Sequence, residues 1–200
     1  MNILSQEEAL PVALSLLKKK GSVLLVPTET VYGLICAADD VDACRKIYEL
    51  KHRPTNKLLA NFVSSVEIVK NKIGSLPSNA CILAEHFCPG PLTIVVPDGK
   101  NGTFGFRIPD HPFVLELLNR FHNIIASTSA NLSGTPAALS VPEALSTLSG
   151  EPDLSVDGGK ISDNSVASTV VQFFSDNSWK ILRNGPISFE DIQNVISMSN

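Results

Sequence analysis

The sequence contains no apolar run that approaches the roughly 18 residues of a membrane span. Its amino terminus, MNILSQEEALP, also lacks the basic segment and continuous apolar stretch of a secretory signal. We therefore expect a soluble, cytoplasmic chain with no membrane partner. A basic surplus is missing as well, because the formal net charge is −4. Proteins whose main task is to coat nucleic acid usually carry such a surplus, so that class is disfavoured.

Cysteine is scarce and is not spaced for metal or disulfide chemistry. Cys36, Cys44, Cys81 and Cys88 never form a C-x-x-C pair, and we expect them to be reduced thiols in apolar surroundings. Familiar motifs are absent too: there is no G-x-x-x-x-G-K-[ST] loop, no G-x-G-x-x-G, no H-E-x-x-H and no G-x-S-x-G. Any nucleotide site must therefore be built in another way.

The composition is that of a globular protein. Apolar residues make up 44% and charged residues 18% of the 200 residues, which suits one domain with a sizeable core. No internal repeat or long linker divides the sequence. We predict a single domain over residues 1–200. Its softest part is 150–165, which is rich in Gly, Ser and Asp and which we expect to be a mobile loop.

Periodicity and capping signals predict a mixed α/β fold. Helix starts are indicated by the capping-box-like pairs Ser5 with Glu8, Ser140 with Glu143 and Ser188 with Asp191. Pro11 implies either a kink in the first helix or a start near Pro11 itself. Further helices are predicted from Asp40 to just before Pro54 and over 65–73, 78–87 and 112–121. Strands are predicted over 23–26, 58–63, 92–96, 104–108, 124–126, 168–174 and 179–182.

Hydroxyl-rich loops follow two of the predicted strands. PTETVYGL (27–34) follows the strand at 23–26, and STSANLSG (127–134) follows the strand at 124–126. Hydroxyls and backbone N–H groups donate to phosphate or carboxylate oxygens, and the cations Lys51, Arg53 and Arg107 lie between the two loops in sequence. This combination indicates an anionic small-molecule ligand.

Each feature also has an ordinary structural explanation. PTETVYGL fits a strand-to-helix turn capped by threonine, and STSANLSG fits a polar turn. Lys51 and Arg53 stand at a helix end, which we expect to be exposed, and the dipole interaction there is worth only about 0.3–1 kcal/mol. Arg107 is less ordinary, because an inward-facing arginine in the strand FGFRI needs an anion, either a ligand or a buried carboxylate.

Taken in order, these motifs resemble the YrdC-like family of threonylcarbamoyl-AMP synthases. The resemblance covers nearly the whole chain, and PTETVYGL with SAN-x-SG is its most specific part. The motifs that carry it are PTETVYGL, K-x-R-P within KHRP, PGPLT (89–93), RIPDHP (107–112), STSANLSG, STVV (168–171) and LRNG (182–185).

The resemblance implies a reaction and a fold. L-threonine, bicarbonate and ATP would give threonylcarbamoyl-adenylate and pyrophosphate, the first step toward threonylcarbamoyladenosine at adenosine 37 of ANN-decoding tRNAs. The fold would be a twisted mixed sheet with flanking helices around a concave basic cavity. ATP is a substrate, and Mg²⁺ is expected to bridge its phosphates with few protein ligands. Those ligands stay unknown, and Glu29 would either help to bind magnesium or cap a helix.

The resemblance also assigns residues. Thr30, Arg107 and Ser168 would hold the threonine, with Arg107 as a bidentate fork for its carboxylate. Lys51 and Arg53 would be catalytic, with Lys51 beside the triphosphate. The ATP contacts would come from Arg53, Lys57, Thr103, Ser129, Asn131 and Arg183.

Some positions depart from the family pattern. Lys57-Leu58-Leu59 stands where members commonly have a proline, Phe62 stands where some place a histidine near the threonine, and Ala167 replaces a frequent Pro or Glu. The chain also ends shortly after its last predicted helix. The resemblance therefore implies the short, single-domain form, which relies on partner proteins for transfer to tRNA.

Two other functions stay open. A double-stranded RNA or tRNA-binding module would join Lys18–Lys20 and KHRPTNK (51–57) into one basic strip. Alternatively, a YrdC-like enzyme with a different carbamoyl acceptor would account for Phe62.

Overall fold

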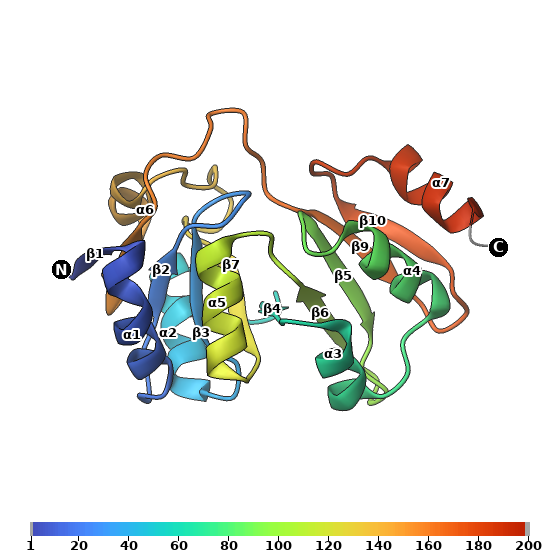
Figure 1. Ribbon diagram of the computed structural model, residues 1–200, viewed down its shortest axis with the longest axis horizontal. Helices are drawn as coiled ribbons and strands as arrows, with labels where there is room; N and C mark the ends of the chain where they lie inside the picture. The colour runs from blue at the N-terminus through green and yellow to red at the C-terminus, as the bar shows by residue number, and fades with distance from the viewer. Residues whose placement is uncertain (1, 199–200) are drawn as a thin grey trace.

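The protein is described by a computed structural model that covers residues 2–198, and these residues form one ten-stranded sheet with helices packed against it. The strand order is β1-β8-β2-β3-β7-β4-β6-β5-β9-β10 (Figure 1). In chain order the strands are β1 (Ile3–Ser5), β2 (Leu24–Val26), β3 (Gly33–Ala37), β4 (Ala60–Phe62), β5 (Leu92–Pro97), β6 (Thr103–Arg107), β7 (Ile125–Ser129), β8 (Leu154–Asp157), β9 (Thr169–Phe173) and β10 (Trp179–Arg183).

The sheet is mixed, as predicted. β8 pairs in parallel with β1 and β2, β4 with β6, and β5 with β9, whereas the other neighbours are antiparallel. The helices are α1 (Gln6–Leu17), α2 (Val41–Lys51), α3 (Val66–Ile73), α4 (Ser78–Phe87), α5 (Pro112–Phe121), α6 (Val141–Thr147) and α7 (Phe189–Met198). None of the helices within residues 2–198 is both long and apolar enough to cross a membrane.

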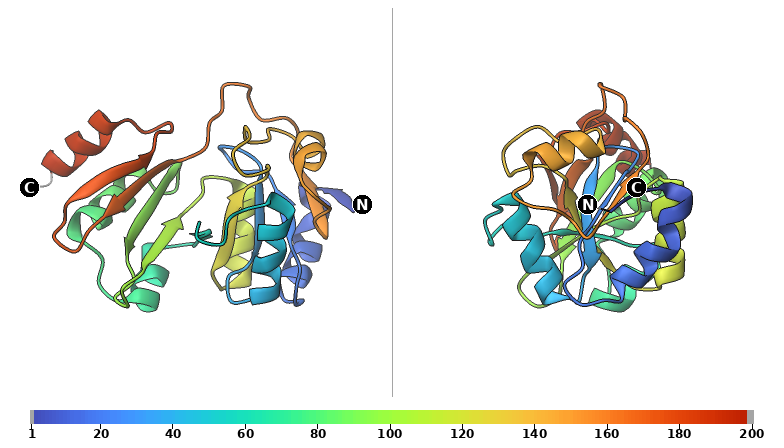
Figure 2. Two further views of the ribbon diagram at one scale, coloured as in Figure 1. Left: turned by 180° about the vertical axis from the view of Figure 1, so that it is seen from behind. Right: turned by 90° about the vertical axis from the view of Figure 1, so that its left-hand side faces the viewer.

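The helices cover the two halves of the sheet differently. In the first half, α1 and α5 pack on one face and α2 and α6 on the other, so β2 is buried on both sides. In the second half, α3, α4 and α7 lie on the same side of the sheet (Figure 2). They pack against the same side chains of β5, β6 and β9, among them Ile94, Phe106 and Val171. Their neighbours Val95, Gly105 and Val170 alternate with these side chains and line a cavity on the opposite face.

Local signals account for the helix starts. The Ser5 hydroxyl accepts a hydrogen bond from the Glu8 backbone N–H, and the Glu8 carboxylate accepts one from the Ser5 N–H. This capping box begins α1 at Gln6, and Pro11 lies inside the helix rather than at its start. Ser140 and Ser188 accept the corresponding bonds at the starts of α6 and α7. The capping predictions are confirmed.

Three strands were not predicted, and two expectations were wrong. Residues 150–165, expected to be a mobile loop, contain β8, whose buried residues pair with β1 and β2 on either side. PTETVYGL does not lead into a helix, because Gly33 begins β3, which turns back antiparallel to β2. The third missed strand, β1, is a three-residue edge strand directly before α1.

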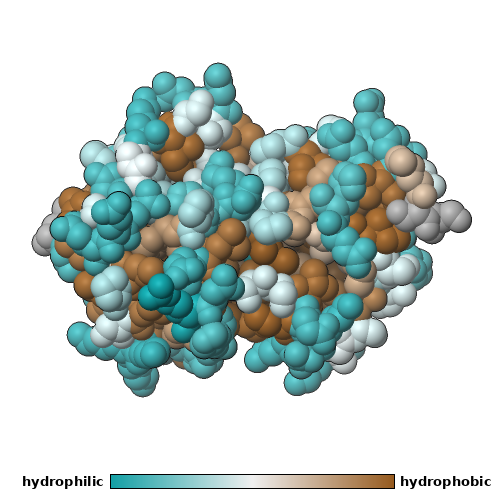
Figure 3. Space-filling view, in the orientation of Figure 1, coloured by the Kyte–Doolittle hydropathy of each residue, from teal (hydrophilic) through white to brown (hydrophobic). Residues whose placement is uncertain are grey.

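The two halves enclose the cavity between them. Its wall comes from both, including Thr28 and Thr30 beside β2, and Thr93 and Ser168 beside β9. In space-filling view the outline of the molecule narrows between the halves (Figure 3). The fold therefore places the hydroxyl-rich loop of the first half opposite the uncovered sheet face of the second.

Candidate active site

The cavity between the halves has a volume of about 440 Å³, which is in the range of small-molecule sites. It brings together seven of the predicted site residues: Thr30, Arg53, Thr103, Arg107, Ser129, Ser168 and Arg183. Lys51, Lys57 and Asn131 do not line it. Other wall residues that the sequence did not single out as ligand contacts include Thr93, Asn56 and Thr128.

The charge of the cavity is one-sided. Arg53, Arg107 and Arg183 line it, and no aspartate or glutamate is among its described wall residues. Desolvation lowers the pKa of Arg183, and the charges of Arg107 and Arg53 lower it further. Burial also lowers the pKa of Arg53. Arginines that gather in one cavity without a carboxylate on its described wall favour an anionic ligand, so the predicted concave basic cavity is confirmed.

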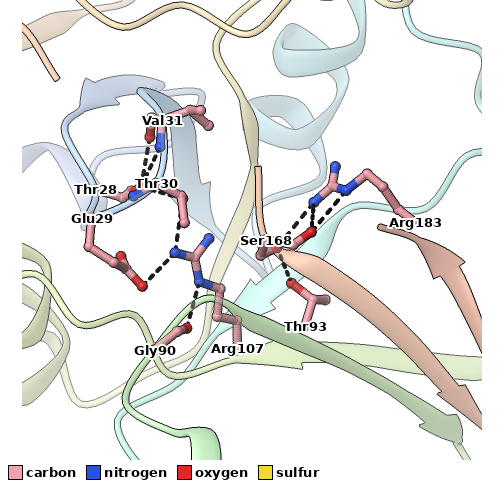
Figure 4. A network of polar contacts seen from close by, with 9 residues as sticks. All are labelled: Thr28, Glu29, Thr30, Val31, Gly90, Thr93, Arg107, Ser168 and Arg183. Atoms are coloured by element: carbon pink, nitrogen blue, oxygen red, sulfur yellow. Dashed lines mark hydrogen bonds and ion pairs between the residues drawn. The ribbon is translucent and has the colours of Figure 1, made fainter. Parts of the chain in front are cut away.

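The hydroxyls of PTETVYGL hold their own loop together. The Thr28 hydroxyl donates to the Val31 carbonyl at 2.7 Å and accepts from the backbone N–H groups of Thr30 and Val31. Since its single hydrogen is used, the Thr30 hydroxyl must donate to it across the 2.9 Å between them. The Thr30 oxygen in turn accepts from Arg107 Nη2 at 2.9 Å. Thr28 and Thr30 thus hold the PTETVYGL loop in shape and connect it to Arg107 (Figure 4).

Arg107 has the buried carboxylate that its strand position called for. Its Nη2 lies 2.6 Å from Glu29 Oε1, and its Nε donates to the Gly90 carbonyl at 3.2 Å. Nη1 has no partner within residues 2–198, so Arg107 offers a ligand one free nitrogen and not a two-nitrogen fork. Glu29 caps no helix, and its partner is an arginine.

Arg183 and Ser168 form a second polar group on the opposite wall. Arg183 donates through Nε and Nη2 to the Ser168 carbonyl at 3.0 and 2.8 Å, and through Nη2 to the Ser168 hydroxyl. That hydroxyl also lies 2.8 Å from the Thr93 hydroxyl. Gly185 of the LRNG motif packs against this segment, where a Cβ atom would collide with the backbone of residues 167–169.

Arg53 belongs to the loop after α2. His52 ends the helix in the left-handed conformation, with φ of 47°. The Arg53 side chain donates to the carbonyls of Lys57 and Leu58 at 2.9 and 2.7 Å. The Lys57 carbonyl therefore helps to fix the Arg53 side chain. The Lys57 side chain is exposed and does not line the cavity.

Lys51 is not at an exposed helix end, as the sequence led us to expect, because its exposed fraction is only 1%. Its Nζ donates to the Ser129 carbonyl, to the Asn131 carbonyl at 2.5 Å and to Asn131 Oδ1 at 3.4 Å. Its own carbonyl accepts from the Ser133 N–H at 2.9 Å. Lys51 thus connects the end of α2 to the SAN-x-SG loop through both its side-chain amino group and its backbone carbonyl.

Asn131 completes this loop from within. Its side-chain amide donates to the carbonyls of Leu132 and Thr135 at 2.9 and 2.7 Å, while its carbonyl groups accept from Lys51. Asn131 therefore shapes the turn after β7, and Ser129 is the loop member that reaches the cavity.

Burial and the nearby charge of Arg53 lower the pKa of Lys51 from 10.5 to about 7. Because the folded pKa lies below the unfolded one, the unfolded chain binds more protons between these two pH values, and stability gained through Lys51 rises with pH there. We predict that the free energy of unfolding of wild type relative to Lys51→Met increases from pH 7 to pH 10, by at most about 1.4 kcal/mol per pH unit. Denaturant unfolding of both proteins across this range measures it. A constant difference would contradict the shift.

The comparisons with known proteins agree with this geometry. A sequence profile of the Sua5/YciO/YrdC family, described as telomere recombination, matches residues 16–185. The chain belongs to the Sua5/YciO/YrdC family. It is 34% identical to a threonylcarbamoyl-AMP synthase of Pyrococcus abyssi over 189 residues and 35% identical to one of Bacillus subtilis over 190, covering 89% and 90% of this chain and 54% of each relative. It thus spans about half the length of these relatives.

A solved structure of the Sua5/YciO/YrdC family has the same fold. The P. abyssi Sua5 complexed with L-threonine superposes with a TM-score of 0.87 at 31% identity, covering 98% of this chain and 61% of that one. The predicted family and α/β fold are therefore confirmed.

The departures from the family pattern lie on the cavity wall. Phe62 is buried and places its ring 5.7 Å from the Arg107 guanidinium carbon, since β4 pairs with β6 in the register that sets Phe62 opposite Arg107. Leu58 and Ala167 also line the cavity. The Arg107 side chain is therefore backed by an apolar ring in this cavity.

The described residues around the cavity form no cluster of metal ligands. Within residues 2–198 no group of three or more His, Cys, Asp or Glu side chains is placed to hold a metal ion, and the cavity wall carries no carboxylate. The described cysteines are free thiols, as expected.

Proposed function

We propose that this chain is a threonylcarbamoyl-AMP synthase, which converts L-threonine, bicarbonate and ATP to threonylcarbamoyl-adenylate and pyrophosphate. The observation that carries the proposal is a cavity with three arginines, several hydroxyls and no carboxylate, in a chain that is about 35% identical to synthases of that name. The product would feed the threonylcarbamoyl modification of tRNA through partner proteins. We propose that residues 2–198 act as one unit, since a single sheet contributes both cavity walls.

The threonine and ATP sites would adjoin at Ser168, whose hydroxyl accepts a hydrogen bond from Arg183. Arg107 would bind the threonine carboxylate through its free Nη1, held in place by Thr30. Ser168, across the cavity, would contact the rest of the amino acid. ATP would lie along Arg53, Thr103, Ser129 and Arg183, where guanidinium groups match phosphate oxygens.

The chemistry needs alignment more than a protein nucleophile. The threonine ammonium group first loses a proton, and the neutral amine attacks the bicarbonate carbon, so that water leaves and a carbamate forms. A carbamate oxygen then attacks the α-phosphorus of ATP, and the bond to the β-phosphate oxygen breaks to release pyrophosphate. The arginines would hold the reacting groups in line and stabilise charge on the departing pyrophosphate. Lys51 and Asn131 would act indirectly, by fixing the loop that carries Ser129.

The structure favours this function over an RNA-binding strip. Lys20 pairs with Asp42 in the first turn of α2 at 2.8 Å, whereas Lys51 lies in its last turn. Asp42 and Lys51 are nine helical steps apart, which is about 14 Å at 1.5 Å per residue. The basic segments therefore lie at opposite ends of α2, and one of them is partly neutralised by an aspartate.

The test is pyrophosphate release by the purified protein with ATP, magnesium and bicarbonate. We expect release that depends on L-threonine, with D-threonine and L-alanine as controls of stereochemistry and side chain. Release that is equal with and without any amino acid would reject the proposal. A preference for another amino acid would support the enzyme with a different acceptor, and would make Phe62 the first position to change.

A further inference from the structure

The three arginines of the cavity differ in how their charge is balanced. Arg107 forms an ion pair with Glu29, in which the two side chains are only 7% and 19% exposed. Arg53 and Arg183 form no ion pair within residues 2–198 and donate only to carbonyl and hydroxyl oxygens. The charge of Arg107 is therefore largely balanced, while Arg53 and Arg183 keep uncompensated positive charges.

Glu29 is placed to balance Arg107 without meeting the ligand. It is not among the residues that line the cavity, and both of its carboxylate oxygens are shielded from solvent. Arg107 is its ion-pair partner. The Glu29 charge is also close to His111, where burial lowers the pKa of the imidazole and Glu29 partly offsets that effect. Figure 4 shows it on the side of Arg107 that is turned away from Ser168 and Arg183. The loop that carries it is fixed by the Thr28 hydroxyl.

This placement matters because both threonine and ATP would present negatively charged groups to the arginines of the cavity. A triphosphate carries several negative charges and would be drawn to the strongest positive field, whereas an amino-acid carboxylate carries one. An arginine already paired with a buried carboxylate keeps its direction and its free N–H groups but attracts a polyanion less. A free arginine at the same position would be a competing phosphate site.

We propose that Glu29 is a positioning and specificity-determining residue that keeps polyphosphate away from Arg107 and so reserves this arginine for the amino-acid carboxylate. The inference rests on the proposed function, since it concerns how the same cavity sorts its two substrates. It does not require Glu29 to touch either of them.

The test is titration calorimetry of L-threonine into wild type and Glu29→Gln, each with and without saturating sodium tripolyphosphate. In wild type we expect the threonine Kd to change by less than about twofold when tripolyphosphate is added. In Glu29→Gln we expect tripolyphosphate to raise the threonine Kd by about tenfold or more, and threonine to weaken tripolyphosphate by the same factor, because coupling is reciprocal. Glu29→Asp, which keeps the charge, should restore most of the independence.

Glu116→Gln is the matched control. It removes the carboxylate of the surface pair that Glu116 forms with Arg120 at 2.6 Å, on side chains that are about half exposed. It should behave as wild type. A merely structural role of Glu29 would lower the unfolding midpoint and weaken both ligands without making them compete.

The outcomes separate this proposal from the proposed function. If wild type binds no threonine, the proposed function fails first. If wild type binds threonine and tripolyphosphate already weakens it tenfold, or if Glu29→Gln stays free of competition, the sorting role of Glu29 is wrong. Should Glu29→Gln not fold, the wild-type and Glu29→Asp titrations still decide, because competition in both would overturn the proposal.

Discussion

Lys51→Met is expected to reduce turnover about 100-fold and to lower the free energy of unfolding by about 1–3 kcal/mol. The buried amino group of Lys51 donates to the carbonyls of Ser129 and Asn131, and methionine fills the same space without a donor. Leaving buried acceptors unpaired costs about 1–3 kcal/mol. A shift of the SAN-x-SG loop by about 1 Å would misplace Ser129 in the cavity, and misplacement of that size can cost about 100-fold in rate. Steady-state kinetics and denaturant unfolding measure the two effects.

Lys46→Met on the same helix is the matched control. Lys46 pairs with Asp153 at 2.7 Å, and both side chains are about one-third exposed. Its loss should cost no more than about 1 kcal/mol and leave turnover unchanged. Full activity of Lys51→Met with an unchanged midpoint would show that the SAN-x-SG loop does not depend on Lys51.

Arg107→Gln should lose stability and activity for separate reasons. It leaves the Glu29 carboxylate buried without a partner, which costs about 3–5 kcal/mol. It also removes the group proposed to bind the threonine carboxylate, and we expect threonine-dependent turnover to fall about 100-fold or more. Unfolding and pyrophosphate release are measured on the same preparations.

The double variant Glu29→Gln with Arg107→Gln separates the two effects. It removes both buried charges, and no carboxylate is left buried without a partner, so most of the lost stability should return. Turnover should stay low, because the threonine carboxylate still has no cation. Recovery of turnover in the double variant would show that Arg107 serves the fold rather than the substrate.

Much of the fold was predictable from local signals. The Ser5 and Ser188 boxes begin helices because side chain and backbone N–H lie three residues apart, a relation that the sequence states directly. β8 was missed because its neighbours in sequence are Gly, Ser and Asp, while its stability comes from β1 and β2, far away along the chain. β3 was missed because the polar residues of PTETVYGL resemble a loop. Nothing in that motif indicates that the chain then turns back and pairs antiparallel with β2.

The sequence predicted most of the residues that meet in the cavity, but it predicted their contacts less well. Family motifs named the arginines and hydroxyls that meet in the cavity. Lys51 was misjudged as exposed because a lysine near a helix end usually is, and the carbonyls that bury it belong to a loop about 80 residues later. The ion pair between Glu29 and Arg107 could not be predicted for the same reason, since the two residues lie about 80 positions apart in the sequence.

The most direct test of the account is mass spectrometry of the product formed from ATP, L-threonine and carbon-13 bicarbonate. If the cavity aligns a threonine carbamate with the α-phosphate of ATP, the product is threonylcarbamoyl-adenylate carrying the heavy carbon, and its formation disappears in Arg107→Gln. Unlabelled AMP or ADP formed at the same rate without threonine would contradict the account, because the arginines of the cavity would then serve ATP alone.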